Sequence, residues 1–437
     1  MDEEENIRVA VRIRPLQQGE ASRGETSCVT AGADGREVQV RMGPLDAHIY
    51  RCNRCFPPET TQQIFFDDCG LKDLLDSAIG GYRACAFAFG QTGSGKTYSI
   101  VGPGSAPRLG EASDGILGRS LDYLFTKLNS LNVKYTLRLS CLEIYHEQVY
   151  DLFTEAPLDR GEKQSLAVRE HATDGFFLDG CRMVPCTTAK AACQALDSAL
   201  KHRQVDAHDL NSRSSRSHCL TDVFIELPGQ AALKSASSGT AYPGLKGLRS
   251  AMVDKDQEYT VMGRITLVDL AGSENMKKTN STGKVGKEAG FINKSLYTLG
   301  KVISGLSRHG GDKTAKEVPF RDSKLTKLLI SSLGGRSRTL LMACVTEASG
   351  SHAETLRTLK FSVSCARIKN RPVRPFPLLP LLPLLSLPSP LNLCRWRAEL
   401  TLASLTPPPS HPLPSCPLSG ALPRPPEAAH HGPAEGD

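Results

Sequence analysis

The segment of this chain that points most directly to chemistry is the glycine-rich octapeptide Gly90-Gln-Thr-Gly-Ser-Gly-Lys-Thr97. It fits the pattern GxxxxGK[ST], in which glycines let backbone amides turn toward phosphate oxygens. A lysine placed like Lys96 reaches the β- and γ-phosphates, and a hydroxyl placed like that of Thr97 binds Mg²⁺. The octapeptide therefore predicts a site for a nucleoside triphosphate.

Two later segments carry polar groups that such a site needs. Leu267-Val-Asp269-Leu-Ala-Gly272 supplies a carboxylate at the end of an apolar run, where Asp269 would hold a magnesium-bound water and the Gly272 amide would sense the γ-phosphate. Asn211-Ser-Arg-Ser-Ser-Arg-Ser-His218 gathers hydroxyl and guanidinium groups. Alone, the second segment fits a polar loop or a phosphorylation site better than a catalytic one.

The elements that must position these groups follow from hydrophobic periodicity. Alternation over 7–14 predicts an early strand, and the apolar run 84–89 predicts a buried strand directly before the octapeptide. Further strands are predicted over 136–144, 220–227 and 264–269, and helices over 120–128, 188–202, 290–306 and 354–369. The sequence therefore predicts an α/β fold, with a central mixed sheet flanked by helices. Residues 228–256, rich in Gly, Ser, Ala and Pro, predict a mobile surface insertion.

Composition narrows the classes of partner. The chain has 437 residues, and 53 Lys and Arg against 46 Asp and Glu give a net charge of +7, too mild for a general nucleic-acid binder. Its 14 cysteines are scattered and the N-terminus lacks a signal-peptide pattern, which favours reduced thiols in the cytoplasm. Cys52-Asn-Arg-Cys55 is the one CxxC, and no second pair completes a zinc site, so the cysteines are interpreted as core residues.

The last 67 residues differ from the rest. Most of the 28 prolines fall within 371–437, which predicts a disordered proline-rich tail after a domain over 6–370. The uncharged stretch 375–394 is long enough to cross a bilayer, but its prolines break a helix, and no membrane segment is predicted. Residues 374–380 match RxxPxxP, a pattern of SH3 ligands.

Taken together, the motifs at 90–97, 211–218 and 269–274 resemble the P-loop, switch I and switch II of kinesin motor domains, in their order and spacing. The resemblance extends to Arg12-Ile-Arg-Pro15, Glu143-Ile-Tyr, and the segments 292–296, 318–326 and 359–361. It covers about residues 6 to 370.

This resemblance implies ATP and Mg²⁺ as ligands. Arg14 and Pro15 would border the adenine base, with Tyr98 as a stacking partner. The implied nucleotide-binding residues are Arg14, Pro15, Gly90, Gln91, Thr92, Gly93, Ser94, Gly95, Lys96, Thr97, Tyr98, Ser214 and Asp269, of which Thr97, Ser214 and Asp269 would hold the metal, the last through water.

The implied catalytic residues are Lys96, Ser215, Arg216, Gly272 and Glu274. Ser215 would lie beside the attacking water, and Arg216 would pair with Glu274 when the switches close. Glu274 would accept the proton through water.

Two basic groups could contact a filament. They comprise Lys277, Lys278, Lys284, Lys287 and Lys294, followed by Arg321, Lys324 and Lys327. Charge alone indicates two solvated faces, whereas the resemblance implies that both face tubulin. The chain departs from the usual pattern at 50–56, at Asn275 and at Glu317, which bears on filament affinity more than on hydrolysis.

Asn6-Ile-Arg-Val resembles the minus-end-directed, C-terminal-motor kinesins, whose roles include spindle and centrosome organisation. Only five residues precede Asn6 and no heptad run is visible, so the chain alone is not expected to walk processively. Two alternatives stay open: a kinesin-like module that grips microtubules with little or no ATP turnover, and an unrelated P-loop enzyme, whose substrate domain is not evident.

Overall fold

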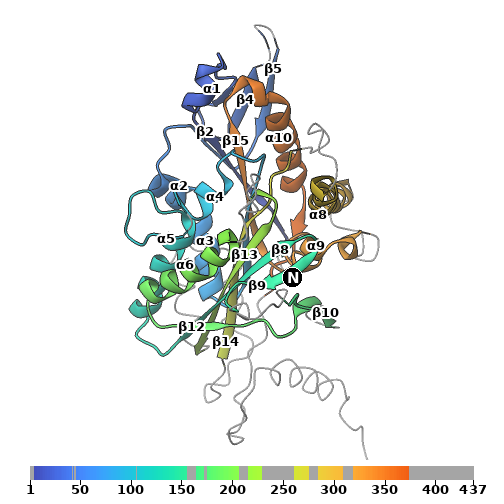
Figure 1. Ribbon diagram of the computed structural model, residues 1–437. Coiled ribbons are helices and arrows are strands. Elements are labelled where there is room, and N and C mark those ends of the chain that lie inside the picture. The colour runs from blue at the N-terminus through green and yellow to red at the C-terminus, as the bar shows by residue number, and fades with distance from the viewer. Residues whose placement is uncertain are drawn as a thin grey trace, which may run out of the picture. The chain divides into compact units, whose positions relative to one another are not determined.

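A nine-stranded mixed β-sheet forms the centre of the fold (Figure 1). Its strand order is β12-β8-β13-β14-β7-β15-β2-β6, with β9 also paired to β8. The strands are β2 Arg8–Arg14, β6 Arg54–Phe56, β7 Arg83–Phe89, β8 Thr136–Tyr145, β9 Gln148–Asp151, β12 Val184–Cys186, β13 His218–Pro228, β14 Thr260–Asp269 and β15 Arg338–Thr346.

The strand before the P-loop lies in the interior of this sheet. β7 pairs in parallel with β14 on one side and β15 on the other, and the parallel pairing continues to β2 and β6. A strand covered on both faces has no solvated side, which explains the uninterrupted apolar run over 84–89. β13 and β8 continue the sheet in antiparallel fashion.

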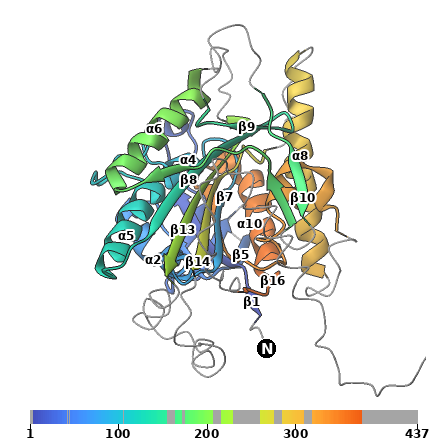
Figure 2. The ribbon, with the colours of Figure 1, turned by 90° about the horizontal axis from the view of Figure 1, so that it is seen from below.

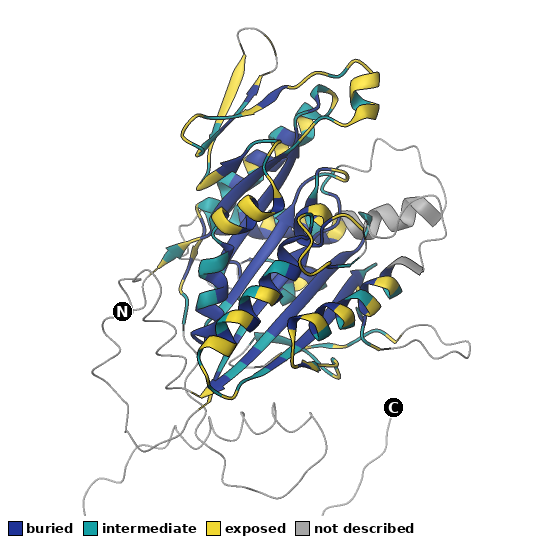
Figure 3. Cartoon of the chain, turned by 90° about the vertical axis from the view of Figure 1, so that its left-hand side faces the viewer, coloured by how far each residue is buried: buried dark blue, intermediate teal, exposed yellow. Residues whose placement is uncertain are grey.

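Alternate side chains of β7 enter two separate cores. Ala84, Ala86 and Ala88 pack on one face of the sheet with α2 Gln62–Asp68, α3 Leu71–Ile79, α5 Ile116–Ser130 and α6 Ala189–Val205. Cys85, Phe87 and Phe89 pack on the other with α8 Lys284–Arg308 and α10 His352–Ala366. Figure 2 shows the sheet between these two groups of helices, and Figure 3 shows its strands buried beneath them.

Smaller elements surround the sheet. A three-stranded sheet contains β3 Val29–Ala31, β4 Glu37–Arg41 and β5 Ala47–Arg51. Two antiparallel two-stranded pairs join β10 Val168–His171 to β11 Gly175–Leu178 and β1 Glu5–Asn6 to β16 Lys369–Asn370. The short helices are α1 Gln18–Ser22, α4 Lys96–Ile100, η4 Phe320–Asp322, α9 Lys324–Leu328 and η5 Ser349–Ser351.

The computed structural model describes residues 4–41, 43, 46–104, 106–154, 164–171, 175–205, 215–228, 260–274, 284–308 and 318–373. The predicted insertion after Pro228 and the tail from residue 374 onward lie outside these ranges. Among the described helices, none combines the length and the apolar character that a membrane crossing requires.

Each predicted strand and helix is found, and the observed ends differ from the predicted ones by up to six residues. α8 begins at Lys284 instead of 290, and α10 ends at Ala366 instead of 369. The second prediction was wrong because the buried Asn370 side chain donates to Ser337 O (2.7 Å) and accepts from Gly334 N (2.8 Å). These tertiary contacts hold residues 369–370 as a strand.

Candidate functional site

The P-loop continues from the carboxyl end of β7, and two of its glycines are required by geometry. A Cβ atom at Gly90 would lie 2.1 Å from Cys344 O of β15, so no larger residue fits there. Gly95 precedes α4 with a φ of 98°, in the left-handed region that favours glycine. The loop can therefore turn its amides inward as the motif predicts.

Lys96 is buried at the base of this loop. Its Nζ donates to Gly90 O (3.0 Å) and Gln91 O (2.9 Å), and burial lowers the pKa of its ammonium group. Ser94 Oγ is also buried, and no described residue contacts it through a hydrogen bond. A buried ammonium and an orphaned hydroxyl inside a glycine loop fit a bound polyphosphate.

Asp269 meets the P-loop from the neighbouring strand. It ends β14 opposite Ala88 of β7, and its Oδ2 accepts from Thr97 Oγ1 at 2.8 Å. Its Oδ1 is buried and has no hydrogen-bond partner among the described residues. A hydroxyl beside a carboxylate with a spare oxygen fits a hydrated Mg²⁺, so the predicted pair of metal-binding residues is brought together.

A cavity of about 540 Å³ extends from the P-loop toward β2. Of the predicted residues, its lining contains Arg14, Pro15, Thr92, Gly93, Ser94, Gly95, Lys96, Thr97, Tyr98 and Ser215. It also contains Arg12, Ile13, Gln17, Pro58, Thr60, Ser99 and Leu270. The predicted base end and phosphate end thus share one cavity, large enough for a nucleotide.

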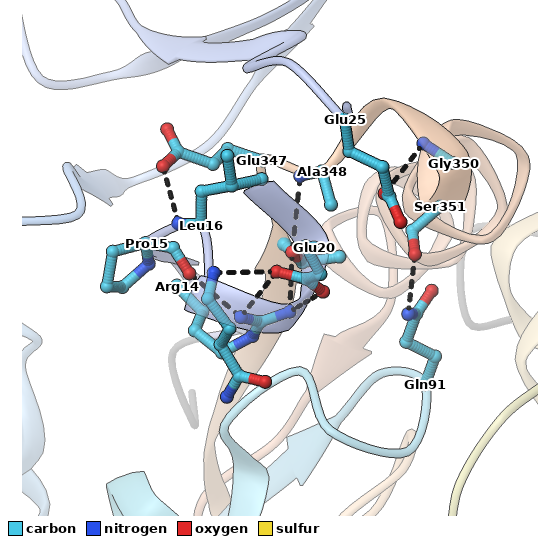
Figure 4. A network of polar contacts seen from close by, with 12 residues as sticks. Arg14, Pro15, Leu16, Glu20, Glu25, Gln91, Glu347, Ala348, Gly350 and Ser351 are labelled. Carbon is cyan, nitrogen blue, oxygen red and sulfur yellow. Dashed lines mark hydrogen bonds and ion pairs between the residues drawn. The ribbon is translucent and has the colours of Figure 1, made fainter. Parts of the chain in front are cut away.

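The base end is preorganised by a network of polar contacts around Arg14 (Figure 4). Its Nη2 donates to Glu20 Oε1 (2.5 Å) and Thr346 Oγ1 (2.8 Å), and its Nη1 to Glu20 Oε2 (3.0 Å). The hydrogen bonds from Arg14 lower the pKa of Glu20. The Arg12 guanidinium lies over the Tyr98 ring, 5.2 Å from its centre. Tyr98 is the residue that was predicted to stack on the base.

The same region connects the P-loop to the segment before α10. Gln91 Nε2 donates to Ser351 Oγ at 3.0 Å, and Glu25 Oε2 accepts from Gly350 N at 3.1 Å (Figure 4). Leu16 N donates to Glu347 Oε1 at 2.6 Å. Both ends of the cavity are therefore held against the junction of β15 and α10.

The two switch segments contact each other and the P-loop. Gly272 N donates to Ser215 O (3.0 Å), and Ser273 N donates to Gly90 O (3.0 Å). The Glu274 carboxylate accepts two hydrogen bonds from Thr92, one from the Thr92 backbone N (2.7 Å) and one from Thr92 Oγ1 (2.5 Å). Glu274 is thus held at the P-loop, and its pairing with Arg216 stays a prediction. Ser214 lies outside the described residues.

Sequence reasoning missed Arg203, which α6 places behind Asp269. Arg203 is buried; its Nη1 donates to Asp269 Oδ2 (3.3 Å), its Nε to Ser217 Oγ (3.1 Å) and its Nη2 to Ser217 O (3.0 Å). Nothing in the local sequence distinguishes it from other arginines near helix ends. It connects switch I, through Ser217, to the metal-binding carboxylate.

His218 is the last residue of the motif 211–218, and the sequence predicted no role for it. Its Nδ1 accepts from Ala271 N (3.0 Å) and its Nε2 lies 2.8 Å from Ser295 Oγ of α8. Burial lowers its pKa to about 3, so the ring is neutral and Nε2 carries the proton that is donated to Ser295. One imidazole therefore links switch I, switch II and α8.

The described members of the two basic groups lie on α8 and on the η4–α9 segment, which pack together. Lys284, Lys287 and Lys294 fall within α8, and Lys277 and Lys278 lie outside the described residues. Arg321 is exposed but pairs with Glu170 of β10 at 2.7 Å. Lys324 N donates to Glu147 Oε2 at 2.9 Å, and Lys327 Nζ lies 5.7 Å from the centre of the Phe176 ring.

The family model of the kinesin motor domain matches residues 12–368, which include the P-loop, both switches and α10. The chain belongs to the kinesin family. This family consists of microtubule motor proteins whose motor domains are P-loop ATPases. The predicted α/β fold, with a central mixed sheet flanked by helices, is confirmed.

Among similar proteins, mouse Kinesin-like protein KIF12 is 37% identical over 372 residues, which is 84% of this chain and 53% of KIF12. Human Chromosome-associated kinesin KIF4A is 35% identical over 368 residues, again 84% of this chain but 27% of KIF4A. The chain thus spans about half or less of the length of these relatives. They do not support the minus-end-directed, C-terminal-motor subfamily that Asn6-Ile-Arg-Val suggested.

Solved kinesin structures agree with the fold. A fast kinesin superimposes with a TM-score of 0.70 at 31% identity, covering 87% of this chain and 96% of the other. A KIF14 dimer in complex with a microtubule and AMP-PNP gives a TM-score of 0.71 at 31% identity, covering 85% and 96%.

Proposed function

We propose that this kinesin motor domain hydrolyses Mg·ATP and that microtubules stimulate the hydrolysis. The observation that carries the proposal is the meeting of Thr97 Oγ1 and Asp269 Oδ2 at 2.8 Å, beside the buried Lys96, in a cavity with room for the nucleotide. The KIF14 relative was solved with AMP-PNP on a microtubule, which supports both ligands. The chain contains every proposed catalytic residue, which favours ATP turnover over the alternative of a module that only binds microtubules.

Bound Mg²⁺ would neutralise charge on the phosphate oxygens, and Thr97, Ser214 and Asp269 would hold it. The chain's own groups supply the rest. The Lys96 ammonium, which now donates to two loop carbonyls, would donate to phosphate oxygens instead. The Gly272 amide, which now donates to Ser215 O, would turn to the γ-phosphate.

We place Glu274 as the proton acceptor, working through a water that Ser215 orients. In the present state Thr92 holds the Glu274 carboxylate through two hydrogen bonds. Pairing with Arg216 would require Glu274 to leave Thr92, so closure of the switches exchanges one partner of this carboxylate for another. That exchange would seal the site when substrate is bound.

The filament-binding face is proposed to comprise Lys277, Lys278, Lys284, Lys287, Lys294, Arg321, Lys324 and Lys327. Its charges would attract an acidic filament and would be screened beyond about 8 Å at physiological ionic strength. Arg321 would exchange Glu170 for an acidic group of tubulin. We propose cytoplasmic microtubules as the location of the protein.

The deciding experiment is steady-state ATP turnover of the full chain with and without microtubules, compared with that of the Glu274→Ala variant. We expect microtubules to stimulate the wild type, and the variant to lose about 10²-fold or more of its turnover while it still binds a fluorescent ATP analogue. Glu226→Ala is a matched control, because Glu226 pairs with Arg138 at the other end of β13 from His218. Wild-type turnover in the Glu274→Ala variant would refute the assignment of the proton acceptor.

For the tail, we propose an SH3 domain as the partner of residues 374–380. The RxxPxxP spacing is the support, because a polyproline II helix presents its prolines to an aromatic groove. A peptide spanning 370–385 should bind at least one of a panel of SH3 domains in a fluorescence-polarisation assay, and a peptide with both motif prolines replaced by alanine should not. Equal binding of the two peptides, or of neither, would end the proposal.

A further inference from the structure

The CxxC segment runs from the connection after β5 into β6, with Cys52 in the connection and Cys55 in the strand, and its backbone is anchored at both cysteines. Cys52 N donates to Arg36 O (2.9 Å) and Cys55 N donates to Gly35 O (2.6 Å). Because Gly35 and Arg36 are consecutive, the two cysteines are bound to carbonyl groups of neighbouring residues. The chain bends between them at Asn53, which exchanges hydrogen bonds with Val9 of β2.

The two thiols contact each other and differ in exposure. A hydrogen bond joins their side chains, lowering the pKa of Cys52 and raising that of Cys55. Cys55 is 5% exposed and lies in the core beside Val11, whereas Cys52 is partly exposed, with its Sγ 3.6 Å from Arg36 O. Cys52 is thus a partly exposed thiol whose pKa is lowered, and its hydrogen-bond partner Cys55 is buried in the core.

We propose that Cys52 and Cys55 are a redox modification site, at which the two thiols form a reversible intramolecular disulfide. The Cys52 thiolate attacks a peroxide, whose O–O bond breaks; the sulfur is oxidised to a sulfenic acid and the peroxide is reduced to water. The Cys55 thiol then attacks that sulfur, the S–S bond forms, and the sulfenic oxygen leaves as a second water. An external dithiol reduces the bond and restores both thiols.

Other cysteines of the described ranges lack this combination. Cys141 and Cys219 also contact each other, but both are buried in the sheet and closed to an oxidant. Cys181 is partly exposed, but burial raises its pKa to about 12, which keeps it protonated. Within the described residues, no three His, Cys, Asp or Glu side chains are grouped to hold a metal.

The test uses the reduced full chain treated briefly with hydrogen peroxide, blocked with N-ethylmaleimide and digested with trypsin under non-reducing conditions. Trypsin cleaves after Arg51 and Arg54, so a Cys52–Cys55 disulfide joins the tripeptide 52–54 to the peptide that begins at Cys55. We expect this linked species by mass spectrometry, and its loss with full recovery of N-ethylmaleimide labelling after dithiothreitol.

Three variants sharpen the result. Cys52→Ser should abolish the linked species, Cys55→Ser should leave a Cys52 sulfenic acid that dimedone traps, and Cys181→Ser should change neither product. The readout does not depend on ATP turnover, so it stands or fails separately from the proposed ATPase. Unmodified Cys52 in the peroxide-treated wild type, or disulfides formed equally at other cysteines, would overturn the proposal.

Discussion

Removing the charge of Arg203 tests whether this unanticipated residue supports the metal-binding carboxylate. In the Arg203→Met variant, the guanidinium that lies 3.3 Å from Asp269 and 3.9 Å from Glu143 is replaced by an uncharged chain of similar length. The two carboxylates stay in place, with their side chains 4% and 0% exposed. Two buried carboxylates then lose the cation that they share.

The expected cost follows from this burial. Breaking a buried ion pair by removing one partner destabilises a protein by about 3–5 kcal/mol, because the remaining charge is left uncompensated. The carbonyl of Ser217 also loses its hydrogen bond from Nη2. We therefore expect the free energy of unfolding to fall by about 4 kcal/mol. With a urea m-value of about 3 kcal/mol/M, the unfolding midpoint should fall by about 1.3 M.

The assay is urea unfolding followed by far-UV circular dichroism at neutral pH, with Lys201→Met as the control. Lys201 lies on the same helix, and its pair with Asp197 at 2.6 Å is solvent-exposed, with the lysine side chain 60% accessible. An exposed pair of this kind contributes about 0.5 kcal/mol or less. A loss below about 1 kcal/mol for Arg203→Met, or equal losses for both variants, would refute the argument from burial.

Three further predictions test other parts of the molecule. Unfolded histidine binds a proton below pH 6.5, but folded His218 does so only near pH 3. The stability of the wild type should therefore fall between pH 6 and 5 by about 1.2 kcal/mol more than that of His218→Gln, measured by urea titration at both pH values. Equal falls would contradict a neutral buried imidazole. A Cβ at Gly263 would lie 1.7 Å from a backbone carbonyl of α3, so Gly263→Ala should cost about 1–3 kcal/mol in thermal unfolding, whereas Gly300→Ala, with open space in α8, should not destabilise. The double variant Arg321→Ala and Lys324→Ala should weaken binding in microtubule co-sedimentation and flatten the salt dependence of that binding. Its ATP turnover without filaments should be unchanged. An equal loss of that turnover would show that the two side chains support the fold instead of binding the filament.

Much of the site could be predicted because its signals are local. The P-loop motif is contiguous in the sequence, the left-handed backbone conformation of Gly95 is a local property, and the apolar run of β7 reports burial on both faces. Asp269 was predicted from its place at the end of an apolar run, and parallel pairing with β7 brings it to Thr97. Short-range rules of chain conformation suffice for such features.

Other contacts had no local signal. The hydrogen bond between Thr92 and Glu274 joins residues 182 positions apart, and that between Arg203 and Asp269 joins residues 66 apart. The end of α10 was predicted too late, because helical periodicity continues past Ala366 while Asn370 is held by distant carbonyls. In each case the deciding energy comes from a partner that the neighbouring sequence does not contain.

The sequence by itself therefore determined which chemistry this protein carries: a phosphate loop, a metal-binding carboxylate and the order of strands and helices around them. Only the tertiary structure decided which buried charges meet, which carbonyls occupy Lys96 and Gly272 in the present state, and which cysteine is exposed beside its partner. The physical reason is that backbone conformation depends on nearby residues. Burial and charge pairing depend on how the sheet brings distant segments together.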